Sequence, residues 1–160
     1  MCLMLWVASE VPLATVTLAD PQTPDPVNGY HRVEAVAPGA PVRARFTLSH
    51  VSYVGSHEGC GCGYNSGDLA FEGFERVDEV REHLTAMSDE ERAKFDREQR
   101  SRELLRAIVE DALTRGAVEV FGCWAGDEVE AAIAVEEVAP SRFTELVEPI
   151  EERVLYRVTR

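Results

Sequence analysis

Short apolar runs alternate with polar connections over the first third of the chain. Residues 2–8, CLMLWVA, form a continuous apolar run that is typical of a strand buried on both faces. Residues 31–36, HRVEAV, alternate weakly and indicate a second strand. Residues 42–56, VRARFTLSHVSYVGS, alternate more clearly. They predict one long strand, or two strands separated by a bend near Ser49.

The hydrophobic period changes to that of a helix in the middle of the chain. Apolar side chains recur at helical spacing over residues 76–87 and predict a first helix. Ser88 and Glu91 match a capping box, so we expect a second helix over residues 88–115. Six residues form its apolar face: Leu104, Leu105, Ile108, Val109, Ala112 and Leu113.

The last third of the chain returns to strand patterns. Two apolar segments, AVEVFGCW and VEAAIAVEEV, flank AGDE and predict a hairpin with Cys123 near its turn. The segment ERVLYRVTR alternates and indicates a half-buried strand with a basic outer face. Strands, then helices, then strands predict a single α+β domain over residues 1–160, with a mainly antiparallel sheet and two central helices.

Charge and composition narrow the classes of partner. The chain has 160 residues, a net charge of −13 and a pI of about 4.7. This charge disfavours binding to nucleic acid and to anionic membranes, and it favours a basic protein partner or a cation. No stretch approaches the roughly 18 apolar residues of a membrane helix. The apolar start lacks a preceding basic residue, so we expect no signal peptide and a cytoplasmic protein, with its four cysteines as reduced thiols or metal ligands.

The segment SHEGCGCGYNSG, residues 56–67, carries the strongest candidate chemistry. Five glycines lie between positions 55 and 67, which predicts a tightly folded backbone. On a strand, residues i and i+2 are roughly 6.6 Å apart. Two thiolates on one zinc ion must approach to roughly 4 Å, and Gly61 would permit the bend that brings Cys60 and Cys62 together. Cys-x-x-Cys is the commoner zinc spacing. Further ligands are expected from Cys123, Cys2 and His57. His50 is a weaker candidate, because it shares a face of the predicted strand with Phe46 and Leu48 and is expected to be a hydrogen-bonded core histidine.

Two segments resemble a group of small bacterial proteins. The start MCLMLWVASEVPL and the later HVSYVGSHEGCGCGY are similar to proteins that begin Met-Cys and carry a Tyr-x-Gly-Ser-x-x-Gly-Cys-Gly-Cys-Gly segment. The resemblance covers these two segments and not the helical middle. It implies a shared loop and supplies no mechanism.

The leading hypothesis is zinc binding through the glycine-rich loop, and several alternatives stay open. Cys60 or Cys62 could serve as a redox or nucleophilic thiol, with loop amides and His57 lowering its pKa. Removal of Met1 would expose Cys2 as an N-terminal nucleophile. The cysteines could also simply pack inward as small hydrophobes. An alternative from another functional class is a protein-interaction module without catalysis, which fits the acidic surface.

Overall fold

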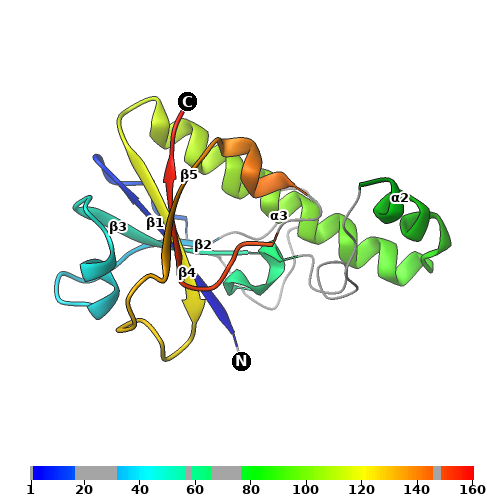
Figure 1. Ribbon diagram of the computed structural model, residues 1–160, viewed down its shortest axis with the longest axis horizontal. Helices are drawn as coiled ribbons and strands as arrows, with labels where there is room; N and C mark the ends of the chain where they lie inside the picture. Colours follow the sequence, from blue (N-terminus) through cyan, green and yellow to red (C-terminus); the bar gives the residue numbers. More distant parts are fainter. Residues whose placement is uncertain (1, 17–31, 57–58, 66–76, 146–148) are drawn as a thin grey trace.

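In the part of the chain that the structure describes, six strands form one sheet in the order β2-β3-β1-β4-β6-β5 (Figure 1). The computed structural model describes residues 2–16, 32–56, 59–65, 77–145 and 149–160. The strands are β1 (Leu3–Ser9), β2 (Arg32–Ala35), β3 (His50–Gly55), β4 (Val118–Trp124), β5 (Ala134–Val138) and β6 (Val154–Val158). All neighbours pair antiparallel except β5 and β6, which pair parallel. The α+β class and the mainly antiparallel sheet that the sequence predicts are confirmed.

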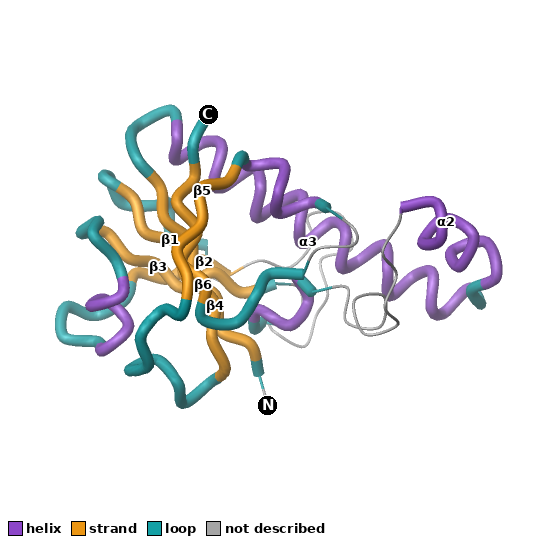
Figure 2. The backbone as a smooth tube through the Cα atoms, in the orientation of Figure 1, coloured by secondary structure: helices purple, strands orange, loops and turns teal. Residues whose placement is uncertain are grey.

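Both helices occur close to their expected bounds. Helix α2 spans Val77–Ala86, and α3 spans Asp89–Leu113. Ser88 caps α3 through the capping box with Glu91, as the sequence predicts. The C-terminal half of α3 crosses one face of the sheet, whereas its N-terminal part and α2 extend away from the sheet (Figures 1 and 2). Among the helices of the described residues, none has the length and apolarity that a membrane crossing requires.

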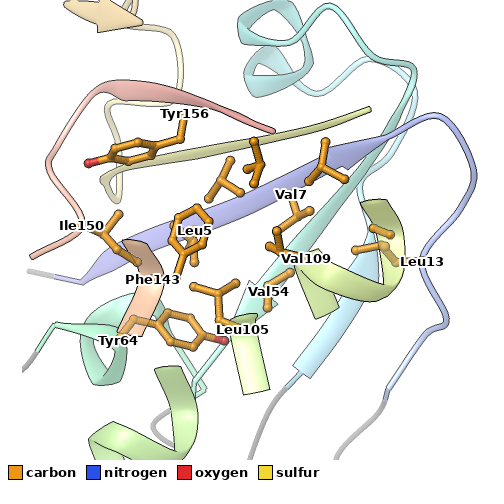
Figure 3. Close-up of a cluster of buried hydrophobic side chains, with 14 of the residues drawn as sticks. Leu5, Val7, Leu13, Val54, Tyr64, Leu105, Val109, Phe143, Ile150 and Tyr156 are labelled. Carbon is orange, nitrogen blue, oxygen red and sulfur yellow. The ribbon is translucent and has the colours of Figure 1, made fainter. Parts of the chain in front are cut away.

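The face of the sheet under α3 carries the larger of two apolar clusters, here called the helix-side core (Figure 3). Leu105 and Val109 of α3 are fully buried against β1 residues such as Leu5 and Val7. Phe143, in the short 3-10 helix η3 (Pro140–Thr144), joins them. The apolar face expected for the second helix is therefore the face that packs on the sheet.

The opposite face carries a smaller cluster, here called the outer core, and the segment before β3 covers it. Its buried members are Trp6, Ala8, Val42, Val51, Phe121, Cys123 and Leu155. Residues Pro41–Arg45 form a 3-10 helix, η1, and strand begins only at His50. The expectation of a strand over residues 42–48 is therefore wrong. Phe46 and Leu48 pack against the outer core instead of pairing in the sheet.

The expected hairpin of the two segments around AGDE is also wrong. Strand β4 pairs with β1 and β6, and β5 pairs with β6 on the far side. Strand β6 thus lies between the two segments that the local sequence pattern predicts to form a hairpin. It is also more buried than expected, because Leu155 enters the outer core while its neighbours Val154 and Tyr156 enter the helix-side core.

Candidate metal centre

Three cysteines from two distant parts of the chain converge at the start of β1. Cys2 directly precedes β1, Cys60 directly precedes the 3-10 helix η2 (Gly61–Tyr64), and Cys62 lies within η2. The three Sγ atoms all lie within 4.8 Å of one another. Cys2 is exposed, and Cys60 and Cys62 are partly buried. The group could therefore hold a metal ion and remains accessible from solvent through Cys2.

Hydrogen bonds within the loop hold the two loop cysteines in place. The Ser56 N–H donates to the Cys60 carbonyl over 2.7 Å, and the Gly59 N–H donates to the Ser56 carbonyl over 2.9 Å. The buried hydroxyl of Ser56 accepts a hydrogen bond from the Gly63 N–H over 3.1 Å. Ser56 thus ties together the residues on both sides of Cys60 and Cys62.

Two glycines allow the loop to fold back this tightly. A Cβ atom on Gly55 would lie 2.5 Å from the Gly59 carbonyl oxygen, which no side chain could accommodate without a shift of the backbone. Gly59 itself has φ +76°, a region that favours glycine. These two glycines therefore permit the tightly folded backbone that the sequence predicts.

The loop is fastened to β1 and to the helix-side core. A Cβ atom on Gly61 would lie 3.0 Å from the Leu3 carbonyl oxygen, so the loop backbone packs closely on the start of β1. The Leu3 N–H donates to Cys62 Sγ over 3.2 Å. On the other side of Cys62, Tyr64 is fully buried beside Leu105 and Phe143 in the helix-side core (Figure 3).

Asn65 fixes the end of the loop. Its Oδ1 accepts a hydrogen bond from the Ile150 N–H over 3.0 Å, and its Nδ2 donates to the Ile150 carbonyl over 3.4 Å. The segment before β6 is thereby attached to the residues that follow Cys62. Sequence reasoning missed Ser56, Tyr64 and Asn65, although all three lie within or beside the segment that it singled out.

The protonation of the thiols depends on their burial. Burial raises the pKa of the Cys60 thiol to about 12, although a hydrogen bond from the main chain of Cys62 opposes the shift. Burial also raises the pKa of Tyr53 to about 12, with the negative charge of a Cys60 thiolate as the next cause. The Tyr53 hydroxyl donates to the Gly59 carbonyl over 2.8 Å. In the metal-free protein, Cys60 is a neutral thiol at neutral pH, which does not favour its use as a nucleophile.

The spacing of the sulfur atoms suits a thiolate-bound ion. Zn–S bonds of about 2.3 Å in a tetrahedron place the sulfur atoms about 3.8 Å apart. Sulfur atoms within 4.8 Å of one another exceed that spacing by about 1 Å at most. Thiolates select soft or borderline ions such as Zn²⁺ and Cu⁺.

The structure brings three of the cysteines together and places the fourth elsewhere. Cys123 lies opposite Met4 in the β1–β4 pairing and is fully buried in the outer core. Within the part of the chain that the structure describes, the metal-ligand group contains Cys2, Cys60 and Cys62, and Cys123 does not join it. His57 lies outside the described residues. His50 is exposed at the start of β3, so the expectation of a core histidine there is wrong.

Comparisons with protein-family models, curated proteins and solved structures find no match to this chain. The function must therefore be inferred from the site itself.

Proposed function

We propose that this protein binds a zinc ion through the thiolates of Cys2, Cys60 and Cys62. The observation that carries the proposal is the convergence of three sulfur atoms within 4.8 Å. Residue 2 and residues 60–62 are distant in sequence, so chance proximity of neighbours in one turn does not account for the full group. Zinc fits because it accepts three thiolates and is redox-inert, so the bound ion itself undergoes no redox change in a reducing compartment.

The surroundings of the sulfur atoms support a bound thiolate. The Leu3 N–H donates to Cys62 Sγ, and a main-chain hydrogen bond from Cys62 reaches the Cys60 sulfur. Such N–H···S bonds stabilise negative sulfur and orient it toward an ion. Without an ion, burial keeps Cys60 protonated. An ion supplies the positive charge that offsets this burial.

Metal content is the first test. The protein is purified without chelator, with any tag at the C-terminus because Cys2 lies near the N-terminus, and is analysed by mass spectrometry for bound metals. We expect close to one zinc per chain for the parent protein and for Cys123→Ala, the matched control outside the group. Each of Cys2→Ser, Cys60→Ser and Cys62→Ser should lose most of the ion, and metal content below about 0.1 equivalent in the parent protein would refute the proposal.

Cobalt substitution tests the ligand set. Cobalt(II) bound to thiolates gives a charge-transfer absorption whose intensity rises with the number of Co–S bonds, so the Cys123→Ala spectrum should match the parent spectrum. Removal of any one of the three grouped cysteines should weaken the band. A tetrahedral ion also needs a fourth ligand, for which His57 remains a prediction from the sequence. A His57→Gln variant tests it through the zinc affinity, measured by competition with a chromophoric chelator.

A further inference from the structure

The edge of the sheet at β5 combines an edge-strand backbone with exposed apolar side chains. In the sheet order β5 is terminal, and within the described residues it pairs with β6 alone. The large hydrophobic residues most exposed in the described part of the chain are Val129, Ile133 and Val135, at 60%, 68% and 53%. All three lie in β5 or in the segment that leads into it. At the other edge of the sheet, by contrast, Val16 bridges β2 through two hydrogen bonds with Val33.

The same edge is strongly acidic. Seven acidic side chains and two basic ones occupy residues 127–137 and 151–157. Both basic side chains already have acidic neighbours. Arg153 Nη2 lies 3.7 Å from Glu130 Oε2, and Arg157 Nε lies 3.7 Å from Glu119 Oε1. Glu136 and Glu137 stand on β5 itself. The negative electrostatic potential at this edge therefore attracts a basic partner.

We infer that the β5 edge binds an extended basic segment of another protein, which adds to the sheet as a seventh strand. Backbone hydrogen bonds to an edge strand supply affinity in this mode, and alternate side chains supply specificity. Val135 lies opposite Leu155 on the outer-core face, and Val138 packs on the helix-side core. A bound strand would place an apolar side chain beside Val135 and basic side chains beside Glu136 and Glu137.

A second copy of this chain fits the edge poorly. Antiparallel self-pairing centred on β5 would set Glu136 opposite its own symmetry mate, and like charges opposite each other destabilise a strand pair. Each chain also carries a net charge of −13, which opposes association of two copies. Charged residues on an edge strand discourage self-association while leaving pairing with a strand of opposite charge open.

The test uses the full-length protein and an immobilised array of octapeptides. Each peptide carries β-branched residues around two central positions that are both basic, both glutamine or both acidic. We expect binding to the basic set alone, with a loss of about tenfold or more between low and high salt. Hydrogen exchange should show added protection of the β5 amides by the best peptide. N-methylation of alternate amides of that peptide should abolish binding for one set of alternate positions and spare the other.

Charge-reversal variants locate the site. Glu136→Lys with Glu137→Lys should lower the affinity for the basic peptide about tenfold or more. Asp96→Lys with Glu103→Lys, both exposed on α3, makes the same change in net charge and should retain the affinity. Equal binding of the basic and glutamine peptides, or protection of other amides instead of β5, would overturn the inference. A dimer in sedimentation at micromolar concentration, with β5 protected, would also overturn it, because a second copy would then occupy the edge.

Discussion

The N–H of Leu3 donates a hydrogen bond to Cys62 Sγ over 3.2 Å and so joins two residues that are 59 positions apart in the chain. The donor belongs to the first residue of β1, and the acceptor is a candidate metal ligand. A shift of either partner therefore changes the geometry of the site.

Thiol reactivity should distinguish the grouped cysteines from Cys123. In metal-free protein at neutral pH, we expect iodoacetamide to modify exposed Cys2 fastest and fully buried Cys123 slowest. Zinc should slow the labelling of Cys2, Cys60 and Cys62 about tenfold or more, because bound sulfur is a poor nucleophile. Residue-by-residue mass spectrometry measures the rates. An unchanged Cys2 rate in saturating zinc would contradict the proposed ligand set.

Gly55→Ala should disrupt the loop and with it the zinc affinity. The added Cβ would meet the Gly59 carbonyl oxygen at 2.5 Å, so the backbone between Gly55 and Gly59 must move. We expect zinc affinity to fall at least about tenfold, as measured by chelator competition. Gly39→Ala is the matched control, because nothing lies within 4 Å of its added Cβ. Equal affinities of the two variants would show that the loop geometry does not control the site.

Glu119 should contribute strongly to stability although it lies outside the site. It is 3% exposed, and its carboxylate accepts hydrogen bonds from the Thr47 N–H over 2.8 Å and from the Thr47 hydroxyl over 2.7 Å. Glu119→Ala leaves these donors without their charged acceptor and should lower the free energy of unfolding by about 2–3 kcal/mol. Urea unfolding measures the change. Exposed Glu103→Ala should stay within about 0.5 kcal/mol of the parent protein, and a similar small effect at Glu119 would refute this account.

Metal-free protein should lose stability as the pH rises above about 9. Burial raises the pKa of both Cys60 and Cys123 from 9.0 to about 12. Between these values the unfolded chain releases protons that the folded protein retains, so unfolding becomes more favourable as pH rises. The decline should cover roughly pH 9 to 12. Cys60→Ser with Cys123→Ala should reduce this slope in chemical unfolding measured against pH, whereas Tyr53, whose pKa burial raises from 10.0 to about 12, should keep a smaller decline above about pH 10. A slope that stays unchanged would contradict the assignment.

The cysteine group could be predicted in part, because two of its members stand in a segment of unusual composition. A Cys-Gly-Cys segment among glycines is rare, and the glycines already imply a tight turn. Cys2 was a candidate because it begins an apolar strand. The separation of Cys123 depends on the register of two strands, since the pairing of Met4 with Cys123 turns that thiol into the outer core. Such register is a property of the assembled sheet and leaves no mark in a short window of sequence.

The errors in the predicted strands have the same origin, namely contacts between distant parts of the chain. Residues 42–48 alternate like a strand, but Pro41 begins a 3-10 helix and the carboxylate of Glu119 binds the main chain at Thr47. That contact spans 72 positions and is invisible locally. The expected hairpin likewise ignored β6, which enters between β4 and β5. The helices, whose capping box and apolar face are local, were placed to within two residues at each end.

The central place of β1 has a consequence for synthesis on the ribosome. Strand β1 is synthesised before both of its neighbours and pairs on one side with β3, which ends at residue 55, and on the other with β4, which begins at residue 118. Cys60 and Cys62 leave the ribosome soon after β3 and long before β4. An ion captured at that moment would hold the nascent β1 beside the loop while one of its edges still lacks a neighbour. The candidate metal centre would thus add a contact to the start of β1 in the interval before β4 is synthesised.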